Sequence, residues 1–309
     1  MTTGEPDGAV FALSVVISTH DRPALLREAI AAIRSQDLPE PIETIVVWDK
    51  TEPEWDLADA DPHRPVRILA NDRTPGLPGS RNCGASAAAA PVVGFCDDDD
   101  LWLSDKARRQ LDLLESTGAD TCSSGLDLLV DGQVITRRGT EGVLRYVDLL
   151  RSRRLEACMC TALVRTKAFW GAIGPLDENI PGGYAEDYEW MLRATRHAPV
   201  AVVPEPLLQV RWIVRSHFRD QWAEWEGALS QILRDNPDFD RERRGRARIE
   251  GQIAVAIAAQ GRRVDALRQI RTTLASSWRE PRALIALAVV AGVPAGRISA
   301  ALNKRGRGI

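Results

Sequence analysis

The sequence has few cysteines and no long apolar run. Its 309 residues include five cysteines, none in a CxxC pair and most among apolar residues, which favours reduced core thiols over disulfides or a zinc site. No basic segment followed by an apolar core stands at the N-terminus, and no apolar run reaches the roughly 20 residues that span a bilayer. These absences predict a cytoplasmic protein. The cysteines are Cys83, Cys96, Cys122, Cys158 and Cys160.

Motifs of several common enzyme classes are also missing. The chain has no GxGxxG, no GxxxxGK[ST] and no GxSxG motif. No motif therefore supports a dinucleotide oxidoreductase, a P-loop NTPase or an α/β-hydrolase. An EF-hand loop starting at Asp97 is excluded, because its sixth position is Trp102 and not glycine. We expect no nucleic-acid partner, because no aromatic residues alternate with the C-terminal arginines as stacking platforms.

The composition is that of a globular protein with an uneven charge distribution. An apolar fraction of 44% with 27% charged residues is enough to bury a core, and the length fits one α/β domain with a smaller appendage. The net charge of −3 conceals a basic end, because residues 241–309 carry 15 Lys and Arg against 4 Asp and Glu. Such a segment could dock on the acidic remainder or on an anionic membrane surface.

Strands and helices are predicted to alternate through the first hundred residues. Residues 11–19, 42–48, 66–70 and 92–96 read as buried strands, and helical periodicity follows Pro23. We expect a turn at 75–79 and a helix at 80–90. This alternation predicts a parallel sheet with ligands at the carboxyl ends of its strands.

The residues after about 217 differ in character. Helical patterns cover 219–234, 243–260, 263–276 and 281–291, and no strand is convincing there. We read the apolar segment 283–301 as a packed core helix, too short to span a membrane.

Four consecutive aspartates, Asp97 to Asp100, follow the fourth predicted strand. Adjacent carboxylates repel at a strand end, and a divalent cation with hard oxygen ligands, Mg²⁺ or Mn²⁺, would remove the conflict. The alternative is a solvated acidic turn capping a helix that starts near Trp102 or Ser104.

Five motifs together resemble family 2 glycosyltransferases of the GT-A fold. They are SVVISTHDRP, VVWD, GLPGSRN, FCDDDDLW and GGYAEDYEWMLR, and they run in the family's order over roughly residues 12–215. The resemblance implies an α/β protein with a mixed, mainly parallel sheet flanked by helices and a C-terminal α-helical extension. It implies a GT-A catalytic domain over 1–216, with a donor-binding half at about 11–103 and an acceptor half at about 104–216, and a helical domain over 217–309.

The resemblance also implies an activity. The chain would be an inverting, hexosyltransferase-type enzyme that moves a sugar from a nucleotide-diphosphate sugar, with UDP or dTDP favoured, to an acceptor hydroxyl. Asp99 would be the chief ligand of Mn²⁺ or Mg²⁺, His217 a further ligand and Asp100 a helix cap. Asp187 would be the general base, and Glu186 would bind the acceptor. The residues that would bind the nucleotide sugar are Ser18, Thr19, His20, Asp21, Asp49, Arg81, Asp97 and Asp98.

Several of these residues have ordinary structural alternatives. Asp49 could be a turn carboxylate, Arg81 a solvated side chain, Asp187 an N-cap or first-turn acid and His217 a structural histidine. His20 stands where the family often has Tyr, and Lys50-Thr51 replaces the commoner Gly-Ser, so the donor base is open.

The acceptor and the tail are also open at this point. The acceptor could be a saccharide, a lipid-linked glycan or a natural product, and the tail could select it, form a homodimer or contact the inner face of the membrane peripherally. The competing function is a non-catalytic nucleotide-sugar-binding module whose helical tail recruits a partner.

Overall fold

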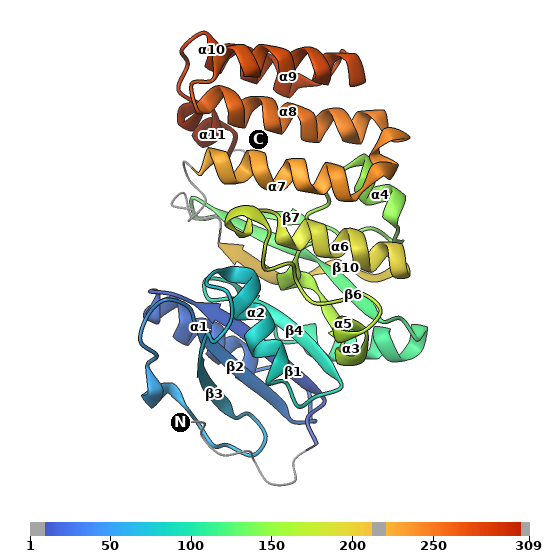
Figure 1. The fold of residues 1–309 in the computed structure, drawn as a ribbon. Coiled ribbons are helices and arrows are strands. Elements are labelled where there is room, and N and C mark those ends of the chain that lie inside the picture. Colours follow the sequence, from blue (N-terminus) through green and yellow to red (C-terminus); the bar gives the residue numbers. More distant parts are fainter. Residues whose placement is uncertain (1–9, 212–220, 304–309) are drawn as a thin grey trace.

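The computed structural model describes residues 10–211 and 221–303 (Figure 1). The strands are β1 (Leu13–Thr19), β2 (Ile42–Trp48), β3 (Val66–Ala70), β4 (Val92–Asp97), β5 (Leu101–Trp102), β6 (Thr121–Val130), β7 (Gln133–Arg137), β8 (Gly142–Leu144), β9 (Leu163–Arg165) and β10 (Val200–Arg211). The helices are α1 (Pro23–Arg34), α2 (Leu77–Ser86), α3 (Lys106–Thr117), α4 (Tyr146–Arg151), α5 (Thr166–Trp170), α6 (Glu186–His197), α7 (Trp222–Asp235), α8 (Arg243–Ala259), α9 (Arg263–Ser276), α10 (Pro281–Val290) and α11 (Ala295–Asn303). Short 3₁₀ turns are η1 (Trp55–Leu57), η2 (Met159–Thr161), η3 (Pro181–Gly183) and η4 (Pro237–Asp240).

One mixed sheet organises the described part of the chain. Its strand order is β3-β2-β1-β4-β9-β6-β10-β5, with β7 on β6 and β8 on β10. The pairs β1–β2, β1–β4, β2–β3 and β6–β10 are parallel, whereas β9 runs antiparallel between β4 and β6. Ser18 lies opposite both Val47 and Asp97, so the carboxyl ends of three strands are level.

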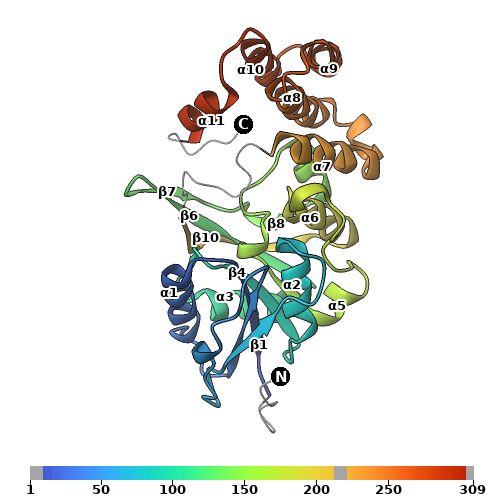
Figure 2. The same cartoon turned by 60° about the vertical axis from the view of Figure 1, so that its left-hand side comes forward.

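Both faces of the first half of the sheet are covered. Every residue of β1 and β2 is buried, as their continuous β-branched runs predict. Side chains alternate between faces, so Val15 of β1 packs with Leu26 and Ile33 of α1, and Val16 packs with Cys83 of α2. Figure 2 shows α1 and α2 on opposite sides of these strands.

Two local predictions around the donor half are wrong. Helix α2 begins at Leu77, inside the predicted turn, with Gly76 at φ 128° before it and Pro78 in its first turn. Trp102 belongs to β5, which pairs with β10, and α3 starts at Lys106 with Asp105 at its N-cap. Asp100 is therefore not the cap of a helix.

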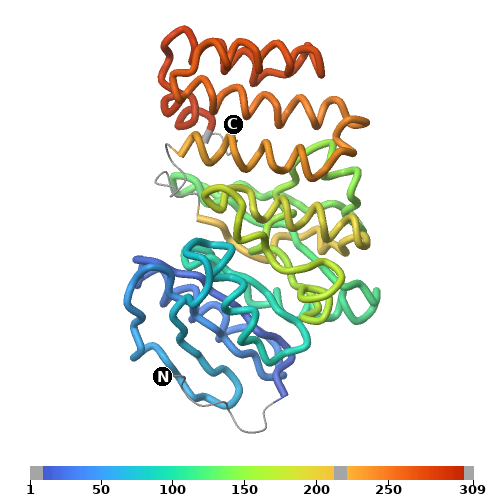
Figure 3. Tube along the Cα trace, viewed as in Figure 1, coloured from blue at the N-terminus to red at the C-terminus, as the bar shows by residue number. Residues whose placement is uncertain are grey.

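The described residues after 220 are helical, and they stack in layers away from the sheet (Figures 1 and 3). Helix α7 lies in the layer next to α6 (Figure 1). Helices α8 and α9 form a hairpin around Gly261, whose φ of 78° suits glycine. The prediction of one helix over 283–301 is wrong, because α10 and α11 are separate helices. In the residues described, no helix is both long and apolar enough to cross a bilayer.

Candidate active site

Polar side chains gather where β1, β2 and β4 end. Ser18 and Thr19 close β1, Asp49 follows β2, and Asp97 closes β4. The Asp49 amide donates to the Thr19 carbonyl at 2.8 Å, and Nδ1 of His20 lies 2.6 Å from the Asp49 carbonyl. Parallel register thus brings together residues that are 79 positions apart in the chain, as the sequence predicts.

Asp49 is held by groups of the adjoining loop. Its Oδ1 accepts from Asn71 Nδ2 at 2.9 Å and from the Gly76 amide at 3.1 Å, and Lys50 Nζ lies 3.6 Å from Oδ2. The Ser18 hydroxyl is buried and has no hydrogen-bond partner among the described residues. Asp21 lies exposed between β1 and α1.

Asp98 and Asp99 share one arginine. Arg22 contacts Asp98 at 2.8 Å and also pairs with Asp99, and the Thr19 hydroxyl donates to Asp98 at 2.7 Å. Asp98 is fully buried, and this burial raises its pKa to about 6 although Arg22 acts in the opposite direction. Asp99, the predicted metal ligand, is thus engaged with a cation that our sequence reasoning did not single out.

Arg81 joins the donor half to helix α6. Its side chain is 3% exposed and contacts Asp97 at 2.6 Å and Glu186 at 2.5 Å. Burial lowers the pKa of Arg81, but the two carboxylates more than offset it and the net shift is upward. The alternative of a solvated arginine is therefore wrong. This bridge connects residues 105 positions apart and brings the acidic run to the Glu-Asp pair.

Asp97, Asp100 and Cys160 form a group that could hold a metal ion. One ligand atom from each lies within 4.8 Å of the others, and the Cys160 thiol donates to Asp97 at 3.0 Å. Burial and the neighbouring Asp97 and Asp99 raise the pKa of Asp100 well above its usual range. Two carboxylates beside a thiol are chemically competent for Mn²⁺, and the carboxylates also suit Mg²⁺.

Asp187 lies in the first turn of α6 and pairs with Arg153. Two distances, 2.9 and 3.1 Å, join Arg153 Nη2 to the two Asp187 oxygens. Its neighbour Glu186 is 4% exposed; burial and Asp187 raise the pKa of Glu186 to about 7, against the effect of Arg81. The helix N-cap is Ala185, so Asp187 does not cap α6.

The loop before α6 is wedged between two helices. Gly182, Gly183 and Ala185 have φ of 61°, 67° and 59°. A Cβ on Gly182 would lie 2.8 Å from Glu224 of α7, and one on Gly183 would lie 3.1 Å from Pro78 of α2. Positive φ and close packing together require glycine at both positions.

Sequence reasoning missed three residues of this region, namely Arg22, Arg153 and Cys160. Arg22 had a signal, since it follows the first predicted strand within the motif HDRP. Arg153 belongs to the basic stretch 151–154, and nothing in its local pattern ties it to Asp187. His217, the predicted additional metal ligand, lies outside the described residues.

Residues 14–170 match the family model described as Glycosyl transferase family 2. The chain is 28% identical over 139 residues to "Succinoglycan biosynthesis protein ExoO" of Rhizobium meliloti (strain 1021), which covers 44% of this chain and 39% of ExoO. It is 21% identical over 101 residues to the Escherichia coli "UDP-Glc:alpha-D-GlcNAc-diphosphoundecaprenol beta-1,3-glucosyltransferase WfgD", covering 33% and 40%. The match spans about two fifths of the length of these curated relatives.

Solved structures of S. aureus TarS share the fold. TarS 1-349 in complex with UDP-GlcNAc has a TM-score of 0.62 at 13% identity, over 96% of this chain and 93% of that one. The complex with UDP has a TM-score of 0.57 at 15% identity, over 96% and 92%. With the mixed sheet described above, this likeness confirms the predicted fold class.

Proposed function

Because the chain belongs to glycosyl transferase family 2 and is a glycosyltransferase of the GT-A fold, we propose that it transfers a sugar from a UDP-sugar to an acceptor hydroxyl with inversion at the anomeric carbon. The observation that carries this proposal is the Arg81 bridge, which joins Asp97 to Glu186 beside Asp187. The TarS complex holds UDP-GlcNAc and WfgD is named for UDP-Glc, which favours UDP over dTDP as the nucleotide.

The donor nucleoside would lie over the ends of β1 and β2. Asp49 is 13% exposed and offers a carboxylate to the N–H of a uracil ring. The buried Ser18 hydroxyl, with no partner among the described residues, would hydrogen-bond a nucleoside that reaches it. Thr19, His20 and Asp21 would line the same part of the site, and Asp97 and Asp98 would hold the ribose or the diphosphate.

A divalent cation would compensate the leaving diphosphate. Mn²⁺ or Mg²⁺ fits the carboxylates of Asp97 and Asp100 beside Cys160, and Asp99 would join them if Arg22 turned to the donor phosphates. When bound, the cation supplies charge neutralisation for the UDP that leaves. Arg22 and Arg81 are the cations that this chain itself provides at the same edge.

Asp187 would act as the general base. It takes the proton of the acceptor hydroxyl, whose oxygen bonds to the anomeric carbon while the bond from that carbon to the diphosphate breaks and UDP leaves with the electron pair. Glu186 is committed to Arg81 and almost fully buried, whereas the Asp187 side chain is 15% exposed. A carboxylate has about four lone-pair sites, so the contact with Arg153 leaves room for the acceptor.

We also propose that the chain has two domains, a catalytic one over 1–216 and a helical one over 217–309. The sheet ends with β10 at Arg211, and helices alone follow residue 220 in the described part. Contacts of α7 with η3 and of α8 with α4 support a helical domain that is seated against the acceptor side.

The test is UDP release and sugar transfer with a panel of UDP- and dTDP-sugars, with and without Mn²⁺. We expect Asp187→Asn to lower kcat by about 10²–10⁴-fold with the donor Kd unchanged, because only the proton acceptor is lost. Asp97→Asn should weaken metal-dependent donor binding. Asp120→Asn is the matched control, since Asp120 pairs only with His197 in the described residues, away from the site. Wild-type turnover in Asp187→Asn would refute the base assignment, and UDP release from no donor would refute the proposal.

A further inference from the structure

Three arginines lie in a row that starts at the proposed base. Arg153 holds both oxygens of Asp187, and its guanidinium carbon lies 5.8 Å from the centroid of the Tyr188 ring. Arg248 lies 5.5 Å from the same centroid and donates to the Tyr188 hydroxyl at 2.9 Å. Arg282 lies against Gly251, one turn after Arg248 on α8. Burial lowers the pKa of Arg248, and the charges of Arg282 and Arg153 lower it further. The row therefore leads from Asp187 into the helical tail.

Close helix packing fixes this row. Helix α8 approaches the end of α4 at Gly245, where a Cβ would lie 1.6 Å from the Leu150 carbonyl. Nearly two turns further on, a Cβ on Gly251 would lie 2.8 Å from Cβ of Arg282. Arg153 comes from the segment after α4, Arg248 from α8 and Arg282 from α10. Helix α4 contacts both α6 and α8, and Figure 1 shows α7 between those two helices.

The positive charge of the row exceeds the negative charge around it. Asp187 pairs with Arg153, and Glu280 pairs with Arg282 at 2.8 Å, but Arg248 makes no ion pair with any residue the structure describes. Nε of Arg248 and Nε of Arg282 are buried and lack a hydrogen-bond partner within the same residues. A buried side-chain nitrogen without an acceptor costs free energy, which an anion beside it would offset.

We propose that Arg153, Arg248 and Arg282 bind a phosphate group of the acceptor, so that the acceptor is a phosphate-bearing saccharide. This inference rests on the proposed function, because it assumes that Asp187 faces the acceptor. Guanidinium groups form paired hydrogen bonds to phosphate oxygens, which a neutral saccharide does not offer. The donor diphosphate lies elsewhere in this scheme, beside Asp97 and Arg22 at the ends of β1 and β4.

Two sources of such a phosphate share this chemistry. A lipid-linked saccharide carries a diphosphate at its reducing end, and a soluble sugar phosphate or a phosphate-linked polymer carries a monoester or diester. All of them present anionic oxygens a few bonds from the hydroxyl that attacks. The three arginines would bind the phosphate group in either case.

The first experiment measures binding of inorganic phosphate by calorimetry, with the donor site saturated by UDP and Mg²⁺. Wild-type protein should bind phosphate, and Arg248→Met should bind it at least fivefold more weakly. Arg244→Met is the matched control, because Arg244 is an exposed arginine one turn earlier on α8. Arg282→Met is the second variant and should show the same loss if Arg248→Met misfolds, as judged by its UDP affinity. Equal phosphate binding in the wild type and a folded variant would overturn the inference.

The second experiment measures transfer to three acceptors that share one sugar. They are a sugar carrying a decyl diphosphate, the sugar 1-phosphate and the neutral decyl glycoside. Arg248→Met should raise KM by about 10–100-fold for both phosphorylated acceptors and leave kcat/KM for the neutral one unchanged, since about 1.4–3 kcal/mol per paired contact is lost. If KM rises for the diphosphate acceptor alone, the phosphate belongs to a lipid-linked saccharide. If KM rises for both phosphorylated acceptors, a soluble sugar phosphate is also accepted. An equal loss for the neutral acceptor would overturn the inference.

These outcomes separate this inference from the proposed function. Sugar transfer that is indifferent to Arg248 refutes the phosphate site and leaves the glycosyltransferase proposal standing. Phosphate binding that depends on Arg248, without any sugar transfer, refutes the proposed function and leaves an anion site at these arginines.

Discussion

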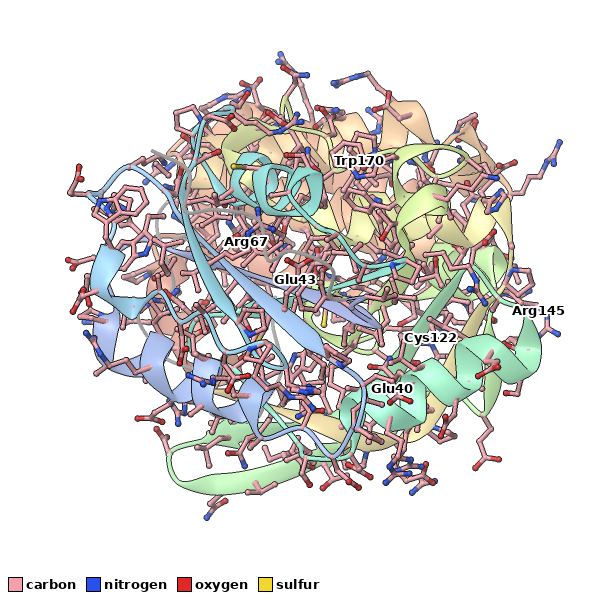
Figure 4. The ribbon with its side chains drawn as sticks, turned by 90° about the horizontal axis from the view of Figure 1, so that it is seen from below. Glu40, Glu43, Arg67, Cys122, Arg145 and Trp170 are labelled. Atoms are coloured by element: carbon pink, nitrogen blue, oxygen red, sulfur yellow. The ribbon has the colours of Figure 1, made fainter. Side chains whose placement is uncertain are left out.

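Buried carboxylates are paired differently at the two ends of the parallel strands, called here the amino edge and the carboxyl edge of the sheet. At the amino edge, Glu43 is fully buried and accepts from the Ser14 hydroxyl at 2.5 Å, the Ala89 amide at 2.6 Å and Arg67 at 3.0 Å. Figure 4 views this edge from below, with Glu43 and Arg67 labelled on neighbouring strands. At this edge, each carboxylate oxygen therefore has donors of its own.

At the carboxyl edge the carboxylates outnumber their cations. Arg22 pairs with Asp98 and Asp99, and Arg81 pairs with Asp97 and Glu186, while Asp100 makes no ion pair with any residue the structure describes. Such a surplus of negative charge is destabilising unless a ligand neutralises it. The hydrogen bonds and the ion pair of Glu43 are satisfied without a ligand. A buried carboxylate therefore indicates a functional site when it lacks enough donors or cations within the protein, and not merely because it is buried.

The largest expected effect comes from breaking the carboxyl edge at Arg81. We expect Arg81→Met to lower the free energy of unfolding by about 3–5 kcal/mol, because Asp97 and Glu186 would lose a buried partner. Sugar transfer should fall below detection. Urea unfolding and UDP release measure the two effects.

The matched variant at the amino edge is Arg67→Met. Arg67 is 20% exposed and Glu43 keeps its other donors, so this variant should lose less stability and keep its activity. An equal loss in both variants would remove the distinction between the edges.

A smaller effect is expected for Glu43→Gln. The amide cannot accept all the bonds of the carboxylate, and one charge-assisted contact with Arg67 is lost, which costs about 1–3 kcal/mol. Since Glu43 is at the edge remote from the site, kcat/KM should stay within twofold of the wild type. Denaturant unfolding and steady-state kinetics test this, and a tenfold fall in kcat/KM would contradict a purely structural role.

The smallest effect is a pH dependence from Glu186. Its pKa is raised from 4.5 to about 7. Between these pH values the Glu186 side chain is deprotonated in the unfolded chain and protonated in the folded one. Stability from this group is full below pH 4.5 and is lost as pH rises through 7. From pH 6 to pH 8 the wild type should lose about 1.4 kcal/mol more than Glu186→Gln. Identical pH profiles in metal-free buffer would show that Glu186 titrates normally.

Much of the donor half could be predicted from the sequence, because its strands are continuous apolar runs. The predicted strands 42–48 and 66–70 coincide with β2 and β3. Strand β6 is harder to recognise, because it opens with the residues TCSSG, small and buried yet mostly polar. Its partner β10 is 70 or more residues away, and no local pattern encodes that pairing.

The site was predictable where a sequence motif marks the end of a strand or the start of a helix. The acidic run and the Glu-Asp pair were found in this way, but of the cations that pair with them only Arg81 was. Arg153, which pairs with Asp187, lies in a segment without helical or strand periodicity. Cys160, which contacts Asp97, lies in the turn η2 before β9. An ion pair across 34 positions and a thiol hydrogen bond across 63 positions both depend on tertiary structure, which residue spacing does not reveal.

The glycine-lined loop between α2 and α7 restricts how this protein can be re-engineered. Gly182 meets Glu224 of α7, and Gly227 of α7 in turn leaves 3.1 Å between an added Cβ and Pro181. The loop has no side chain at these positions with which to adjust to a foreign helix. A chimera that exchanges the helical tail to alter acceptor choice must therefore exchange residues 180–187 with it, as one inherited unit.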